Sequence, residues 1–379
     1  MKELRIGLIG FGFIGKIHTL AYQNLLMSIK NPKIKPKLVA LLRSPLTAPG
    51  DGLASSIFET VTTNPDQFFD QDMDLIDICT PNHLHFSQVE RSLKSVRAVY
   101  CEKPLAMTYP ESLKLAHMAE SLHAITQVAY MMRFSPAIRQ IKRLLADGMI
   151  GDLYHYRAFK YHASYLDTQR PISWRLRFDQ SGGGAFTDLG SHLADLSRYL
   201  FGPPQQIRAQ MRTYIHKRPE KPGSDQLREV DVDDWTQCIL DYGSGGMGEI
   251  EVSRVAAGSG ELTGIDIFGS KGAISFKSTN PESVTYYDLN QKAWNICEIF
   301  PTSIGQERMI ADIWPEKKFS QGDMVNRHMA AIYDLLLNIS ESKPCLVDFK
   351  EAAKSEEIVD ATYRSARESG SWIRINNRD

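Results

Sequence analysis

Three short stretches of this 379-residue chain carry side chains that fit a single reaction. The first is the glycine-rich run Gly10-Phe11-Gly12-Phe13-Ile14-Gly15, and the second is Cys101-Glu102-Lys103-Pro104. The third runs from Gly182 to His192 and contains Asp188. A nucleotide cradle, a lysine and an Asp/His pair are the minimum set for moving a hydride between a nicotinamide and a hydroxylated carbon.

The glycine-rich run follows the apolar segment Leu4 to Ile9 and opens an amphipathic stretch. Glycines without side chains let the backbone approach a pyrophosphate, and a helix N-terminus presents unpaired N–H groups to it. This context favours dinucleotide binding over a merely tight turn. The cofactor-binding residues predicted here are Gly10, Gly12, Phe13, Ile14 and Gly15.

The end of the second expected strand bears on the choice of cofactor. Strands at this position commonly end in an acid that binds the adenosine ribose, whereas the segment Lys37 to Leu42 is followed by Arg43 and Ser44. An arginine there can face a 2′-phosphate, which favours NADP slightly over NAD, or it can be a solvated strand-end residue. The expected cofactor is therefore NAD or NADP.

Two further strand ends are expected at the same edge of the sheet. After the fourth strand, the backbone of Thr80 and Pro81 and the side chain of Asn82 can contact the pyrophosphate or the nicotinamide ribose. His85 either joins them or simply begins a helix.

After the fifth strand, Pro104 prevents continuation of the strand, so the Lys103 ammonium is directed out of the sheet. Lys103 can polarise the substrate oxygen, and Glu102 can bind a ribose hydroxyl. The alternative for Lys103 is an ordinary solvated lysine.

In the third stretch, Asp188, His192 and Asp195 fall at i, i+4 and i+7 of an expected helix. Asp188 can bind a substrate hydroxyl and stabilise the imidazole of His192, which then takes the hydroxyl proton. The alternative is a helix-start acid and a buried core histidine. Zinc is a further possibility, but no cysteine or second helical histidine completes a ligand set, so no metal is predicted.

Composition argues for a small-molecule substrate. Lys and Arg total 44 against 45 Asp and Glu, a formal net charge of -1, so no basic excess indicates nucleic acid or an anionic membrane as partner. No signal segment or membrane-spanning apolar run is found, and the five cysteines form no CxxC pair. We expect a cytoplasmic protein.

The fold class expected is α/β, in two domains. Residues 1–130 alternate short apolar runs with amphipathic stretches, which predicts a parallel Rossmann sheet that binds a dinucleotide. Residues 131–379 contain many alternating runs, which predict a substrate-binding and oligomerisation domain with a large, mostly antiparallel sheet. The charged segment Lys217 to Asp234 is expected to be a surface loop. A partly apolar second sheet face predicts a homodimer or homotetramer.

These motifs, in this order, resemble the Gfo/Idh/MocA oxidoreductase family over nearly the whole chain. The resemblance implies a Rossmann domain followed by an α/β domain whose open sheet face often mediates dimers or tetramers. It implies Lys103, Asp188 and His192 as catalytic residues and adds Arg133 to the cofactor site. It also implies substrate-contacting roles for Tyr161, His162, Trp174 and Arg175, beside Asp188 and His192.

Together these features predict an NAD(P)-dependent dehydrogenase or reductase acting on a secondary alcohol of a sugar, sugar derivative or cyclitol. One alternative is a glycoside-cleaving enzyme that oxidises its sugar transiently and returns the hydride. The other is a regulatory protein that binds the nucleotide without turnover.

Overall fold

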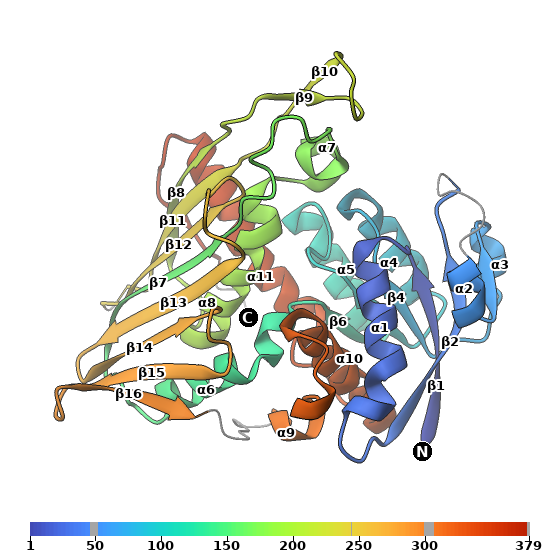
Figure 1. Cartoon of the computed structure of the whole chain (residues 1–379), viewed down its shortest axis with the longest axis horizontal. Coiled ribbons are helices and arrows are strands. Elements are labelled where there is room, and N and C mark those ends of the chain that lie inside the picture. Colours follow the sequence, from blue (N-terminus) through green and yellow to red (C-terminus); the bar gives the residue numbers. More distant parts are fainter. Residues whose placement is uncertain (46–51, 244, 299–306, 377–379) are drawn as a thin grey trace. The chain divides into compact units, whose positions relative to one another are not determined.

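A six-stranded parallel sheet with strand order β3-β2-β1-β4-β5-β6 forms the first part of the computed structural model, which describes residues 1–45, 52–243, 245–298 and 307–376 (Figure 1). Its strands are β1 (Lys2–Ile9), β2 (Ile34–Leu42), β3 (Thr60–Thr62), β4 (Leu75–Ile78), β5 (Ala98–Cys101) and β6 (Ile125–Val128). This order is that of a Rossmann fold, as predicted. The short β3 leaves no periodic signal in the sequence.

Parallel pairing aligns the ends of four strands in one row. Ile9 pairs with Ile78, Ile78 with Cys101, and Cys101 with Val128. The residues that leave the sheet continue the row through backbone hydrogen bonds, from Cys79 N to Ile9 O (2.8 Å) and from Glu102 N to Ile78 O (2.9 Å). The segments beginning at Gly10, Cys79 and Glu102 therefore leave the sheet at one level.

Helices accompany this sheet, and the last of them comes from far along the chain. They are α1 (Phe13–Ser28), α2 (Gly52–Ile57), α3 (Pro65–Phe69), α4 (His85–Leu93), α5 (Tyr109–Ser121), α9 (Ile310–Ile313) and α10 (Asp323–Glu341), with single turns η1 (Asn82–Leu84), η2 (Met131–Phe134) and η5 (Lys317–Phe319). Buried residues of α10 such as Ile332 and Leu336 belong to the same hydrophobic core as β1.

The compact units of the chain therefore differ from a division at residue 130. The first unit comprises Met1–Ala106, Pro110–Phe134 and Gly305–Ala353, and the second comprises Met107–Tyr109, Ser135–Ile304 and Lys354–Asp379. The described residues from 307 to 353 return to the first unit because the apolar side of α10 is buried against its core. Sequence order alone gives no signal for such a return.

The second unit is built on a nine-stranded sheet with order β16-β15-β14-β13-β7-β12-β11-β8-β17. Its strands are β7 (Leu153–Tyr161), β8 (Gln206–Arg212), β11 (Trp235–Asp241), β12 (Met247–Ser253), β13 (Leu262–Gly269), β14 (Gly272–Lys277), β15 (Ser283–Asp288), β16 (Ala293–Glu298) and β17 (Ile373–Arg374). Every pairing is antiparallel except the parallel pair β7 and β12, so the predicted mostly antiparallel sheet is confirmed. The expected loop 217–234 contains a small hairpin of β9 (Lys217–Pro219) and β10 (Leu227–Glu229).

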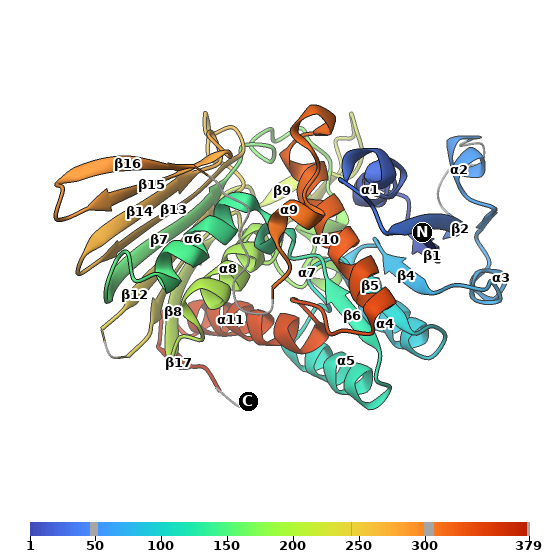
Figure 2. The same cartoon turned by 90° about the horizontal axis from the view of Figure 1, so that it is seen from below.

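Helices lie on one face of this large sheet (Figure 2). They are α6 (Pro136–Ala146), α8 (Ser191–Phe201) and α11 (Phe349–Arg367), while the short α7 (Phe178–Ser181), η3 (Trp174–Leu176) and η4 (Phe186–Gly190) precede α8. Ile250 and Val252 of β12 are buried on the helix side, whereas Glu249 and Glu251 alternate onto the opposite face. We call that opposite face the open face.

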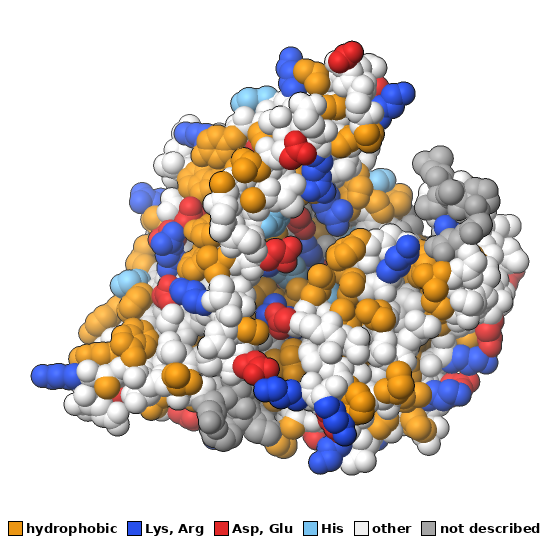
Figure 3. Space-filling view, in the orientation of Figure 1, with side chains coloured by type: hydrophobic (Ala, Val, Ile, Leu, Met, Phe, Trp, Pro, Cys, Tyr) orange, Lys and Arg blue, Asp and Glu red, His pale blue; other side chains and the backbone are white. Residues whose placement is uncertain are grey.

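The surface over these strands mixes charged and apolar side chains. Where the sheet lies at the left of Figure 3, lysines, arginines and acids are interspersed with hydrophobic patches. On β16, Trp294 is 55% exposed and Ile296 is 73% exposed. Among the helices of the described residues, none is long and apolar enough to cross a membrane.

Candidate active site

The glycine-rich loop between β1 and α1 meets three different steric demands. Gly10 has φ +93°, and a Cβ there would lie 2.8 Å from the Cys79 carbonyl oxygen. A Cβ on Gly15 would lie 2.2 Å from the carbonyl oxygen of Gly10, so only glycine lets α1 pack this closely. A Cβ on Gly12 would meet nothing within 4 Å, so this part of the loop faces open space at the helix N-terminus.

This loop fits a dinucleotide. Gly12 precedes the first residue of α1, a 16-residue helix with no acidic residue in its first turn. The helix N-terminus therefore presents its positive dipole end and N–H groups without a competing carboxylate, which suits a pyrophosphate. Phe13, 70% exposed, and the partly buried Ile14 follow at the start of the helix.

At the end of β2, Arg43 is half-buried and its backbone N–H donates to Thr62 O (2.9 Å), while Ser44 is exposed. No acid stands at this strand end. Arg133 lies elsewhere in the first unit, within η2, where it is buried and donates from Nη1 to the carbonyl of Leu346 (3.4 Å).

The segment after β4 is fixed by hydrogen bonds. Thr80 donates from Oγ1 to Gln88 Oε1 (2.6 Å), Pro81 precedes η1, and Asn82 is buried at the start of that turn. His85 is fully buried, with Nδ1 2.7 Å from Pro104 O and Nε2 2.8 Å from Thr80 O. Because both ring nitrogens face backbone carbonyls, we assign His85 to bracing the two loops rather than to the cofactor.

Glu102 and Lys103 directly follow β5. Glu102 is 7% exposed; its Oε2 accepts the backbone N–H of Lys103 (3.1 Å), and its Oε1 lies 3.1 Å from His18 Nε2. Burial alone would raise the pKa of Glu102, but the hydrogen bond and charge of His18 hold it at about 2. Glu102 is therefore an ionised carboxylate with its side chain fixed inside the protein.

In the second unit, the glycine turn before Asp188 and His192 is built around a buried carboxylate. Asp233 accepts N–H groups from Gly184 (2.8 Å) and Phe186 (2.9 Å), and the hydroxyl of Tyr363 donates to it (2.8 Å). A Cβ on Gly184 would lie 2.1 Å from Asp233 O, so glycine is required for this approach. Asp233 thus satisfies donors at the start of the helical segment.

Asp188 lies in η4, a π-helical turn, and the buried His192 lies in the first turn of α8. Such turns are frequent at functional sites. Asp195 has different surroundings: it is fully buried and accepts the hydroxyl of Ser355 on α11 (3.0 Å). Of the three side chains predicted on one helix face, Asp188 and His192 remain as candidates for the site.

His162 follows β7 and is close enough to Asp188 for their charges to interact. Burial lowers the pKa of His162 and outweighs the opposing effect of Asp188. Its Nδ1 is 2.8 Å from the hydroxyl of Ser164. The structure thus brings His162 and Asp188 into one neighbourhood.

The other expected substrate residues lie in different surroundings. The Arg175 guanidinium stacks over the ring of Trp174 at 4.3 Å from its centroid. Tyr161 donates to Glu251 Oε2 (2.6 Å), and strand alternation puts both on the open face. Because α8 packs on the other face, we do not assign Tyr161 to the substrate.

Some residues at these sites have no signal in the sequence pattern. His18, Asp77 and His328 join Glu102 in the first unit, while Asp233 and Tyr363 hold the glycine turn in the second. His18 and His328 are 310 positions apart. Three acids just before β11, Asp231, Asp233 and Asp234, were the one available hint of a buried carboxylate.

A dinucleotide cradle at the carboxyl edge of a Rossmann sheet, joined in one chain to a sheet domain with an Asp/His helix, defines an NAD(P)-dependent oxidoreductase. Residues 4–130 match the oxidoreductase family with an NAD-binding Rossmann fold, and residues 138–275 match the GFO/IDH/MocA C-terminal domain. The chain belongs to the GFO/IDH/MocA oxidoreductase family, whose members include sugar and cyclitol dehydrogenases.

Individual relatives agree with this membership. A levoglucosan dehydrogenase of Pseudarthrobacter phenanthrenivorans is 31% identical over 290 residues, 73% of this chain and 74% of that protein. The NAD(+)-dependent scyllo-inositol 2-dehydrogenase of Bacillus subtilis is 25% identical over 79% of this chain and 81% of its own length. The solved structure of a levoglucosan dehydrogenase with NADH and L-sorbose covers 100% of both chains at 26% identity and a TM-score of 0.89.

The Asp233 anchor leads to a prediction about stability. Tyr363→Phe removes the hydroxyl that accepts the N–H groups of Gly184 (2.9 Å) and Thr187 (3.1 Å), so it should destabilise the second unit by about 1–3 kcal/mol. Tyr214→Phe, at a 59% exposed tyrosine, is the matched control and should change stability by less than about 0.5 kcal/mol. Urea denaturation followed by hydrogen exchange at residues 184–192 measures both, and equal protection in the two variants would refute the anchor.

Proposed function

We propose that Lys103, Asp188 and His192 are the catalytic residues with which this chain oxidises a secondary alcohol of a sugar, sugar derivative or cyclitol, or reduces the corresponding ketone. The observation that carries the proposal is the Asp188/His192 pair on one helical segment of a chain whose first unit has Lys103 after β5, at the sheet edge where the glycine-rich loop leaves β1. Membership of the family supports it.

Oxidation of the carbinol requires removal of a hydride from carbon and a proton from oxygen. Bound NAD or NADP supplies the hydride acceptor at its nicotinamide ring. His192 takes the hydroxyl proton as general base, and the Lys103 ammonium stabilises the negative charge that develops on the oxygen. Asp188 accepts a hydrogen bond from the substrate and stabilises the imidazolium of His192; in reduction the same groups work in reverse.

The remaining site residues have binding roles in this proposal. Gly10 to Gly15 hold the pyrophosphate, Arg43 and Ser44 face the adenosine ribose, and the cofactor is further contacted by Thr80, Pro81, Asn82, Glu102 and Arg133. His162 binds a substrate hydroxyl, supported by its position near Asp188 and by its lowered pKa, which keeps the imidazole neutral. Trp174 offers an apolar ring face to a sugar and Arg175 offers donors.

Ring sugars are the first substrates to test. The levoglucosan dehydrogenase relative acts on an anhydro-sugar, and the scyllo-inositol dehydrogenase acts on a cyclitol. Both substrates are rigid rings with secondary hydroxyls, and we propose that the substrate of this chain shares that feature.

Assembly and location complete the proposal. We expect a homodimer or homotetramer formed through the open face, supported by the exposed Trp294 and Ile296 beside charged strands. We also expect a cytoplasmic enzyme, supported by five free cysteines, four of them buried.

Lys103→Met tests the catalytic assignment. The substitution keeps the stem and removes the charged donor, so kcat should fall by about 10²- to 10⁴-fold while the Kd for NAD changes by less than about twofold. Lys30→Met, at an exposed lysine after α1, is the control and should leave both unchanged. Steady-state rates with a sugar and cyclitol panel, together with calorimetric titration of NAD, provide the measurement. Near-normal turnover by the Lys103 variant would remove it from the mechanism.

Arg43→Ala tests cofactor choice. If Arg43 faces the adenosine ribose, NADP binding should weaken by roughly 1.5–3 kcal/mol and NAD binding much less, because only the 2′-phosphate loses a charge-assisted hydrogen bond. Titration of the same variant with both dinucleotides is the measurement, and NAD, which lacks the 2′-phosphate, is the control. Equal weakening of the two would restrict Arg43 to stacking or place it outside the cofactor site.

A further inference from the structure

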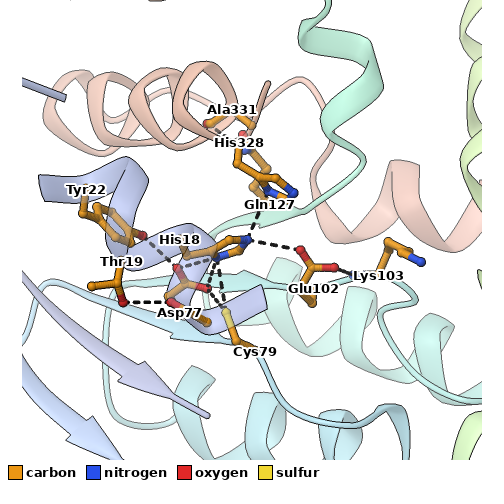
Figure 4. Close-up of polar contacts among 11 residues, drawn as sticks. His18, Thr19, Tyr22, Asp77, Cys79, Glu102, Lys103, Gln127, His328 and Ala331 are labelled. Atoms are coloured by element: carbon orange, nitrogen blue, oxygen red, sulfur yellow. Dashed lines mark hydrogen bonds and ion pairs between the residues drawn. The ribbon is translucent and has the colours of Figure 1, made fainter. Parts of the chain in front are cut away.

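Three buried ionisable side chains of the first unit, His18, Asp77 and His328, have no role in the proposed reaction but surround Glu102. His18 of α1 is fully buried between Asp77 of β4 and Glu102, and His328 of α10 completes the group (Figure 4). His18 Nδ1 is 2.9 Å from Asp77 Oδ2, and His18 Nε2 is 3.1 Å from both Glu102 Oε1 and His328 Nδ1. These contacts involve each nitrogen of the His18 ring.

A protonated His18 satisfies its contacts with Asp77, Glu102 and His328. A neutral imidazole carries one N–H and could donate to only one of the two carboxylates, whereas an imidazolium donates to both. Burial lowers the pKa of His18, but Asp77, followed by Cys79, raises it well above the usual value. Burial and the charge of His18 lower the pKa of His328 to about 3, so His328 is neutral and its Nδ1 accepts from His18.

The other groups facing His18 agree with this pattern. Tyr22 donates its hydroxyl to Asp77 Oδ2 (3.0 Å), and the ring of Tyr100 stacks on His18 at 5.3 Å between centroids. Burial raises the pKa of the Cys79 thiol beside Asp77, so this group stays neutral. The charges of Arg327 and Lys103 act on His328 and disfavour its protonation.

The cluster is connected to Lys103 through one carboxylate. Glu102 uses Oε1 toward His18 and Oε2 to accept the backbone N–H of Lys103 (3.1 Å). An unbroken chain of hydrogen bonds therefore runs from Asp77 through His18 and Glu102 to the Lys103 backbone. In Figure 4 the Lys103 side chain extends away from Glu102, so it is the backbone and not the ammonium that Glu102 holds.

We infer that His18, clamped between Asp77 and Glu102 and backed by His328, is a positioning residue that fixes Glu102 and thereby the backbone from which Lys103 reaches the substrate. The inference rests on the proposed catalytic role of Lys103. Asp77 acts with His18 as a second positioning residue.

The cluster also has the composition of a metal site. His18 Nε2, Glu102 Oε1 and His328 Nδ1 lie within 4.8 Å of one another. A metal ion would have to displace the Nε2 proton, which two acceptors already share, and Asp77 stabilises the protonated ring. We therefore assign a proton to this place, and a bound metal is an outcome that the experiment can detect.

His18→Gln is the direct test, because a glutamine amide can reach one partner but carries no charge and cannot bridge both carboxylates. We expect kcat to fall roughly 10- to 100-fold with the Kd for NAD changed by less than about twofold. His83→Gln, the same change at an exposed histidine of η1, is the control and should behave as wild type. In a Lys103→Met background, His18→Gln should cause no further loss, because its effect passes through Lys103.

The pH profiles separate positioning from a general folding defect. Burial raises the pKa of Glu102 and His18 is the main group that lowers it, so in His18→Gln the pKa of Glu102 should rise and the acid limb of kcat should move to higher pH. Asp77→Asn should do the opposite at the alkaline end: the pKa of His18 falls, the ring loses its proton sooner, and the alkaline limb moves to lower pH. This second variant keeps the test valid if His18→Gln does not fold.

Three results would overturn the inference. The first is a wild-type kcat in both His18→Gln and Asp77→Asn, and the second is a loss of NAD affinity in these variants as large as their loss of kcat. The third is a stoichiometric metal ion in the purified protein whose removal by a chelator abolishes activity. Failure of the proposed function looks different, because Lys103→Met would then retain turnover. If Lys103→Met is inactive and His18→Gln is fully active, only the positioning role is wrong.

Discussion

Parallel hydrogen bonding across β1, β4 and β5 is the constraint on which the rest of the first unit depends. Because Ile9, Ile78 and Cys101 stand in one row, the segments after them begin at the same level of the sheet. Three segments therefore lie at one edge of the sheet because of strand pairing alone: the glycine-rich loop, the loop at Thr80, and Glu102-Lys103. Close backbone packing at Gly10 and Gly15, together with the contact between His18 and Glu102, then restricts the conformations of these segments.

In the second unit, side chains rather than strand pairing hold the segment of the candidate site in place. A helical segment that carries Asp188 and His192 begins at a glycine turn, where backbone donors are buried and need acceptors. Asp233 and Tyr363 satisfy those donors, and Gly183 and Gly184 allow them to approach. In both units, therefore, an acidic side chain accepts backbone N–H groups beside a candidate catalytic residue: Glu102 next to Lys103, and Asp233 before Asp188.

The sequence predicted what is encoded locally. Strand, glycine turn and helix follow one another between Leu4 and Met27, so the Rossmann unit and its cradle could be predicted, and alternation predicted the large sheet. Long-range pairings could not be predicted, because nothing in α10 signals that His328 meets His18, or that Tyr363 meets Asp233. Helical periodicity also could not show that Asp195 is fully buried and accepts the hydroxyl of Ser355 on α11. For Tyr161, the family resemblance implied a substrate contact, whereas strand alternation puts its side chain on the open face beside Glu251.

The central claim is that this chain moves a hydride from a ring carbinol directly to a bound nicotinamide. The most direct test uses levoglucosan and scyllo-inositol deuterated at each ring carbinol in turn, with NAD and NADP, and follows deuterium by nuclear magnetic resonance. The account predicts deuterium at C4 of the reduced nicotinamide from one carbinol position, with a ketone product and no cleavage of a glycosidic bond. Deuterium that returns to the sugar with glycoside cleavage would contradict the account in favour of transient oxidation. No transfer from any member of a wider panel of ring sugars and cyclitols would contradict it altogether.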